Sequence, residues 1–384
     1  MGERFPTESA PAGLARARDL GIPFEGRTGR WNAITDVPGV EVGAVTIIED
    51  EPVVARTGVT VIFPRGKERA ASPCAAGVAV LNGNGELTGR AWIDESGQLQ
   101  TPIAITNSHA VGAVRRGVDR WTAENFPLAA AQWMLPVVGE TWDGYLNSID
   151  DDVVTSDHAV AALESAASGP VAEGSVGGGM GMNCYGFKGG TGTASCIVTS
   201  GDQQWTVGVL MQANFGSRRE LNVEGRRLGR DSAVPNPMED DDWFERETTL
   251  GTDSVPGAGS VIVVVATDAP LLPEQFRALA RRVPLGLARM GTTGSHFSGD
   301  IFLAFSTANE GALRSRMGTA AGTVESLDVL AWGGIDAFYA AVVEATEEAV
   351  LNTLVGAEDM AGRDGHVSYA LPHDEVRRAF RGRV

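Results

Sequence analysis

The chain has 384 residues, a formal net charge of −18 and 43% hydrophobic residues. So much negative charge disfavours nucleic acid as a partner, because phosphate backbones are also negative. The composition is typical of a soluble globular protein, and neither a membrane span nor a secretory signal is expected. The three cysteines, Cys74, Cys184 and Cys196, form no CxxC pair and no disulfide framework, which favours a cytoplasmic location.

Hydrophobic periodicity predicts an α+β protein with more strands than helices. The strands do not alternate regularly with helices, which favours a layered sandwich in one domain over a doubly wound sheet. In chain order, we predict strands at 59–64, 77–81 and 102–106, a helix at 158–167, strands at 195–199, 205–213 and 260–268, a helix at 271–290 that breaks at Pro284, a strand at 300–306, and a helix at 324–355 interrupted at Gly333-Gly334.

One acidic, proline-containing segment, residues 229–257, has few apolar residues. A structureless stretch of this length inside a compact domain is uncommon, so it is either a surface loop or a segment with a function. We predict a mobile linker. It ends immediately before the pair Gly259-Ser260, from which a β-branched strand follows.

The glycine-rich run GGGMGMNCYGFKGGTG, residues 177–192, does not match a nucleotide-binding motif. No register gives G-x-G-x-x-G between a strand and a helix, and Phe187 separates Gly186 from Lys188, so the P-loop pattern fails. We read the run as a place where backbones approach closely. The five histidines are scattered without HxH or HExxH spacing, so neither a metal nor another cofactor is expected.

Ser260 is the candidate nucleophile, although no G-x-S-x-G elbow and no histidine partner accompany it in the sequence. Cleavage of the Gly259–Ser260 peptide bond would give Ser260 a free α-amine. Such an amine titrates near neutrality and can accept the proton of the hydroxyl on the same residue. Glycine before the serine leaves room for that hydroxyl to attack the preceding carbonyl.

Six ordered motifs resemble the DmpA/BapA family, the S58 family of self-cleaving serine aminopeptidases, which contains L-aminopeptidase D-Ala-esterase/amidases and β-aminopeptidases. The motifs are ITDVPGVEVG at 34–43, ITNSHAVG at 105–112, GGGMGMNCYGFKGGTGTAS at 177–195, MQANFG at 211–216, PGAGSVIVVVATDAP at 256–270 and GSHFSGDIFLAFST at 294–307. The resemblance implies a four-layer αββα sandwich similar to N-terminal-nucleophile hydrolases, and self-cleavage into 1–259 and 260–384.

The resemblance also implies the roles of the site residues. Ser298 and Asp300 match a serine-acid pair, and their i, i+2 spacing puts both side chains on one face of a strand entry. Asn214 matches an asparagine that donates a hydrogen bond in the oxyanion hole. Glu140 matches a glutamate that binds the free amino group of the substrate.

Two positions depart from the family pattern. Asp300 stands where the family carries a glutamate, and Trp142 stands near the place of a family tyrosine, with Tyr145 close but displaced. The sequence therefore predicts a serine aminopeptidase or amidase acting on small peptides, amides or esters, in a homo-oligomer of cleaved units. The alternative is an uncleaved, inactive relative that binds a ligand or partner.

Overall fold

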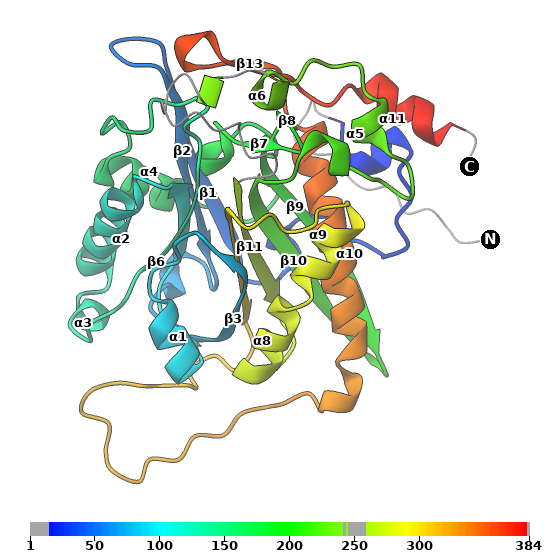
Figure 1. Cartoon of the computed structure of the whole chain (residues 1–384). Helices are drawn as coiled ribbons and strands as arrows, with labels where there is room; N and C mark the ends of the chain where they lie inside the picture. Colours follow the sequence, from blue (N-terminus) through cyan, green and yellow to red (C-terminus); the bar gives the residue numbers. More distant parts are fainter. Residues whose placement is uncertain (1–14, 241–242, 245–258, 382–384) are drawn as a thin grey trace.

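The computed structural model describes residues 15–240, 243–244 and 259–381, and two stacked β-sheets form its centre (Figure 1). The four-stranded sheet has the order β1-β2-β5-β6, in which β1, β2 and β5 are antiparallel and β6 runs parallel to β5. Its strands are β1 Glu41–Glu49, β2 Ala55–Phe63, β5 Ile103–Asn107 and β6 Val137–Thr141.

The six-stranded sheet has the order β4-β3-β12-β11-β10-β9. All neighbours are antiparallel except β11 and β12, which are parallel. Its strands are β4 Gln98–Leu99, β3 Cys74–Gly83, β12 Ser298–Ser306, β11 Gly259–Thr267, β10 Gln203–Asn214 and β9 Gly190–Ser200. Strands β11 and β12 therefore lie inside a sheet whose other strands come from earlier in the chain.

Helices cover the outer face of each sheet (Figure 1). Helices α2 and α4 pack on the four-stranded sheet, and α8 and α10 pack on the six-stranded sheet, with α9 against α10. The helices are α1 Arg90–Ser96, α2 Val111–Asn125, α3 Pro127–Ala130, α4 Ser156–Ser165, α5 Leu228–Asp231, α6 Pro237–Asp240, α8 Pro273–Ala280, α9 Val283–Arg289, α10 Asp336–Val355 and α11 His373–Phe380. Two small hairpins complete the fold, β7 Asn183–Cys184 with β8 Phe187–Lys188, and β13 Met360–Ala361 with β14 Val367–Ser368.

The side chains of β11 show how the layers are joined. Val261, Val263 and Val265 belong to the core between the six-stranded sheet and its helices, whereas Ile262 and Val264 belong to the core between the two sheets. Since both faces are buried, the strand is a continuous β-branched run. Full burial of one such side chain contributes about 1.5–3 kcal/mol, so β11 is strongly fixed in place.

The predicted sandwich is confirmed, as are all seven predicted strands and the helices at 158–167 and 271–290. The predicted helix at 324–355 is too long, because α10 begins only at Asp336, and residues 332–334 form a 3-10 turn. Pro284 lies in the first turn of α9, where its missing N–H costs nothing, and the break falls just before it. In the predicted linker, residues 229–240 include α5 and α6, and residues 241–242 and 245–257 lie outside the described residues.

Two further properties of the described residues bear on the expectations from composition. No helix among them is long and apolar enough to cross a membrane. Cys74, Cys184 and Cys196 are all buried and carry free thiols.

Candidate active site

Ser260 lies at the beginning of β11, in the space between the two sheets. Alternation along the strand puts its side chain on the same face as Ile262, which packs toward the four-stranded sheet. Its Oγ accepts a hydrogen bond of 3.1 Å from the backbone N–H of Trp142, directly after β6. Only 3% of Ser260 is exposed. The nucleophile candidate is therefore buried and already held by one amide donor.

A glycine in β6 explains why the two sheets approach so closely here. A Cβ at Gly139 would lie 3.1 Å from Cγ1 of Ile262, so even a methyl group would press on β11. Without a side chain at this point, β6 can lie close over β11. Its end then reaches Ser260, and the N–H of Trp142 can donate to the hydroxyl.

Asn214 is the last residue of β10 and the register partner of Ser260 across the antiparallel pair. Paired residues share a face of the sheet, so the two side chains start from adjacent positions on the same side. The Oδ1 of Asn214 accepts a hydrogen bond of 2.9 Å from the N–H of Asn183. This contact fixes the orientation of the amide, because the oxygen is directed to Asn183 and the NH₂ end is therefore directed away from Asn183. An amide held in this way is suited to donate to developing negative charge.

Ser298 and Asp300 form a pair at the beginning of β12. Ser298 Oγ donates to Oδ1 of Asp300 at 2.6 Å, and Asn82 Nδ2 donates to the other carboxylate oxygen at 2.8 Å. Burial raises the pKa of Asp300, and the hydrogen bonds from Ser298 and Asn82 oppose that rise. The spacing i, i+2 thus brings the two side chains together as expected.

The strand register places Ser298 beside Gly259 and Asp300 beside Val261, rather than either residue beside Ser260. Ser298 is the register partner of Gly259, and Gly299 is the partner of Ser260. Among the described residues, no side-chain hydrogen bond joins Ser298 or Asp300 to the hydroxyl of Ser260. Ser298 therefore lies at the strand position next to the peptide bond between Gly259 and Ser260.

Glu140 is a buried carboxylate in β6, 6% exposed. Ser108 Oγ donates to its Oε2, and the N–H of Glu86 donates to its Oε1 at 2.8 Å. Burial raises the pKa of Glu140, and these two donors act in the opposite direction. A Cβ at Gly85 would lie 3.2 Å from Glu140 Oε1 and 2.9 Å from Cα of Gly299. Gly85 therefore lies between the carboxylate of Glu140 and Gly299, the register partner of Ser260.

The side chains of Trp142 and Tyr145 belong to an aromatic cluster with Trp243 and His366. The ring of Trp142 stacks on Trp243 with centroids 6.3 Å apart. Tyr145 stacks on His366 at 4.5 Å, and its hydroxyl donates to the carbonyl of Val367 at 3.4 Å. The cluster forms the wall beside the backbone N–H of Trp142.

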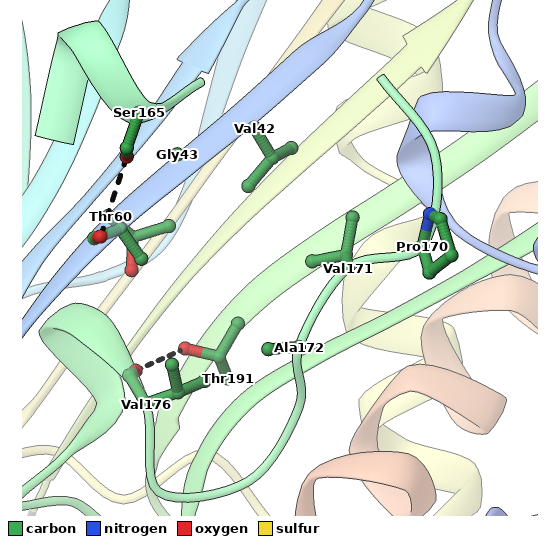
Figure 2. A pocket seen from close by; sticks show the side chains of 10 residues that line it. Val42, Gly43, Thr60, Ser165, Pro170, Val171, Ala172, Val176 and Thr191 are labelled. Atoms are coloured by element: carbon green, nitrogen blue, oxygen red, sulfur yellow. Dashed lines mark hydrogen bonds between the residues drawn. The ribbon is translucent and has the colours of Figure 1, made fainter. Parts of the chain in front are cut away.

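A cavity of about 280 Å³ lies elsewhere, at the outer part of the four-stranded sheet (Figure 2). Its lining includes Val42 and Ala44 of β1, Thr60 of β2 and the apolar residues 170–172, but none of the candidate site residues. A polar side chain of the lining is hydrogen-bonded to its own surroundings: Thr191 Oγ1 donates to the carbonyl of Val176 at 3.0 Å. This cavity is not part of the site around Ser260.

The structure adds residues that sequence reasoning did not assign. Asn82, Ser108 and Asn183 each make a hydrogen bond to one of the candidate residues. Asn183 and Lys188 stand out in the glycine-rich run as polar residues among small and apolar ones, which is the only sequence signal for them. No group of three or more histidine, cysteine or acidic residues within the described part of the chain could hold a metal ion.

Two packed sheets covered by helices, with a serine at the beginning of an inner strand and a backbone amide donating to its hydroxyl, define the N-terminal-nucleophile hydrolase fold. The model of peptidase family S58 matches residues 32–368, and the chain belongs to this family. Over 380 residues it is 47% identical to a β-peptidyl aminopeptidase BapA of Sphingosinicella microcystinivorans, covering 96% of this chain and 92% of that one.

Solved structures agree with this assignment. A Burkholderia sp. β-aminopeptidase matches with a TM-score of 0.86 and 45% identity, over 96% of this chain and 98% of the other. The L-aminopeptidase D-Ala-esterase/amidase from Ochrobactrum anthropi matches with a TM-score of 0.85 and 43% identity, over 95% and 98%; it is described as a variant of the Ntn hydrolase fold and a prototype of the serine aminopeptidases. The predicted class of enzyme, an aminopeptidase or amidase, is confirmed, and nothing favours an inactive binding protein.

Proposed function

We propose that the chain cleaves itself between Gly259 and Ser260 and then releases amino-terminal residues through an acyl-enzyme on Ser260. The observation that carries this proposal is the set of groups around one peptide bond. Asn214 and Gly299 are register partners of Ser260, Ser298 is the partner of Gly259, and Trp142 N–H donates to Ser260 Oγ.

Self-cleavage begins with attack of Ser260 Oγ on the carbonyl carbon of Gly259. The C–N bond breaks, the α-nitrogen of Ser260 takes up the hydroxyl proton, and an ester joins the two residues. Water then hydrolyses this ester, which leaves a carboxylate on Gly259 and a free hydroxyl on Ser260. A Cβ at Gly259 would lie 2.0 Å from the carbonyl oxygen of Asn214, so only glycine fits at this position.

In each turnover, the new α-amine of Ser260 accepts the hydroxyl proton while Oγ attacks the carbonyl of the substrate's first residue. The NH₂ end of Asn214 donates to the oxyanion that forms, because its other end is held by Asn183. The α-amine then returns the proton to the leaving group. Water hydrolyses the acyl-enzyme and releases the first residue.

The Ser298–Asp300 pair acts on the α-amine rather than on the hydroxyl. The register of Ser298 with Gly259 supports this role, because it brings Ser298 to the strand position next to the peptide bond whose nitrogen becomes free after cleavage. Asp300 accepts one hydrogen bond from Asn82 and another from the Ser298 hydroxyl. Because the Ser298 O–H is directed to Asp300, the Ser298 oxygen can accept a hydrogen bond from the amine. The pair thus keeps the amine directed toward its own hydroxyl.

Glu140 binds the ammonium group of the substrate. A buried ammonium needs a carboxylate partner, because an unpaired charge is costly in a low-dielectric site. The substrates are small peptides, amides and esters with a free amino end, as the names of the similar enzymes suggest. The same proposal includes a homo-oligomer, supported by strongly exposed Leu128 and Trp133, and the cytoplasm, supported by the three free thiols.

The proposal is tested by intact-mass measurement on freshly purified protein. Two polypeptides are expected, the smaller one beginning with Ser260, and the variant Ser260→Ala should remain one chain without activity. Active wild-type protein that stays full length would contradict the mechanism.

A further inference from the structure

Lys188 is a fully buried lysine that the mechanism above does not use. It lies in β8, and its Nζ donates to two carbonyls, those of Met182 and Gly189, each at 2.9 Å. The N–H of Gly189 also donates to the carbonyl of Met182, at 2.8 Å. The ammonium thus closes the turn 182–189 from inside, and the carbonyl of Met182 is one of its two acceptors.

That carbonyl belongs to the same peptide group as the N–H of Asn183, which donates to Asn214 Oδ1 at 2.9 Å. A continuous chain of two amides therefore runs from the lysine to the oxyanion donor. Lys188 donates to the oxygen of the first amide, and that amide's N–H donates to the oxygen of the second. The NH₂ of the second amide, on Asn214, is the end of the chain.

We propose that Lys188 is a positioning residue that polarises and orients the Asn214 amide through the Met182–Asn183 peptide, so that the oxyanion meets a donor strengthened by a buried positive charge. This inference rests on the proposed function, because it assigns Asn214 the role of oxyanion donor. Hydrogen bonds arranged head to tail strengthen one another, by about 10–30% per bond, and the effect of a charge is larger in a low-dielectric interior than in water.

The surroundings of the ammonium supply its counter-charge. Burial lowers the pKa of Lys188, and the nearby Asp143 and Cys184 act in the opposite direction. The resulting pKa is about 7. Asp143 is fully buried and follows Trp142 in the chain. Asp143 accepts a hydrogen bond from Asn147 at 3.0 Å, and burial raises its own pKa to about 7. Lys188 is thus the group that stands behind the Asn214 amide, through the hydrogen bonds at the Met182–Asn183 peptide.

A purely structural role does not account for a charged group here. Burying an ammonium is far more costly than burying an apolar side chain of similar volume, because the charge loses its hydration. A methionine would fill the same volume without that cost. What a methionine could not supply is the charged donor to the Met182 carbonyl, and we take this donor to be the function of Lys188.

The test is a double-mutant cycle on the processed enzyme, with rates normalised to the number of Ser260 amino termini. Lys188→Met should lower kcat roughly tenfold with KM nearly unchanged, a part of the loss expected for removal of the donor itself. In the Asn214→Ala background, Lys188→Met should cause no further loss, because the end of the chain is already gone. Losses that multiply would overturn the proposal. Lys67→Met, at an exposed lysine, is the control and should behave as wild type.

Two further measurements keep the proposal falsifiable if Lys188→Met does not fold. Lys188→Gln keeps an N–H donor without the charge and should also lower kcat without adding to Asn214→Ala. In the wild type, the ¹⁵N signal of Lys188 Nζ must be that of an ammonium in the resting enzyme at its working pH, and a neutral amine there would overturn the inference. If Asn214→Ala itself keeps full kcat, the oxyanion role in the proposed function is wrong. If only the lysine variants keep it, this inference alone is wrong.

Discussion

Replacing Gly259 by alanine should separate self-cleavage from turnover. The new Cβ would lie 2.0 Å from the backbone oxygen of Asn214, whereas non-bonded carbon atoms prefer about 3.5–4.0 Å. The beginning of β11 must therefore move by more than about 1 Å away from Asn214, and the scissile carbonyl of Gly259 moves with it. Misplacement by about 1 Å can cost 10²-fold in rate, so Gly259→Ala should slow self-cleavage about 10²-fold. Turnover per processed molecule should stay near wild type, since residue 259 is then no longer bonded to Ser260.

The assay follows the ratio of full-length to cleaved chain on denaturing gels at set times after synthesis, with active sites counted by amino-terminal sequencing. Gly83→Ala is the matched control. Gly83 is the register partner of Gly299 on β3, close to the site, and a Cβ there meets nothing within 4 Å. Processing of Gly259→Ala at the wild-type rate would refute the argument that contact with Asn214 fixes the scissile bond.

Two further predictions concern the carboxylates. Because burial raises the pKa of Glu140, kcat/KM for substrates with a free amine should fall on the acid side at a higher pH than an ordinary glutamate would give, since protonation removes the partner of the ammonium. Glu140→Gln should abolish this limb and lower kcat/KM while processing continues; equal wild-type rates on amino-acetylated substrates would contradict the role. Ser298→Ala and Asp300→Asn should each slow both cleavage and turnover, and because one 2.6 Å hydrogen bond joins them, the double variant should be barely slower than the slower single variant. If the losses of the two single variants in cleavage and turnover rate multiply in the double variant, Ser298 and Asp300 act independently.

The fold could be predicted where the side chains alternate or run continuously in an obvious way. The β11 run is β-branched on both faces and was predicted within one residue at each end. Strand β1 was missed because only part of it is buried and its sequence includes Gly43 and Ala44. The fully buried strand β6 is short and contains Gly139 and Glu140, neither of which favours a strand on its own. Their burial comes from packing on β11, which a single sequence does not reveal.

The site could be predicted from ordered motifs, but its internal geometry could not. The motifs identify Ser298 and Asp300 as a pair, yet only the register of β12 with β11 shows that Ser298 lies beside Gly259 and Asp300 beside Val261. The hydrogen bond to Ser260 Oγ comes from the backbone N–H of Trp142. Since every residue except proline has this donor, the identity of residue 142 does not reveal it. Likewise, the glycine-rich run gave no reason to connect Lys188 with Asn214, since Asn183 links them through main-chain atoms.

The interleaved order of the six-stranded sheet sets the reaction order of refolding. A cut before Ser260 would give β11 and β12 to one polypeptide, while both strands that flank them, β10 and β3, belong to the other. Neither piece retains this sheet alone, so the mature enzyme, once unfolded, can reassemble only by collision of two chains. Heat inactivation should thus become harder to reverse as the protein is diluted. An uncut chain keeps its strands tethered, so the refolding of its six-stranded sheet should not depend on concentration.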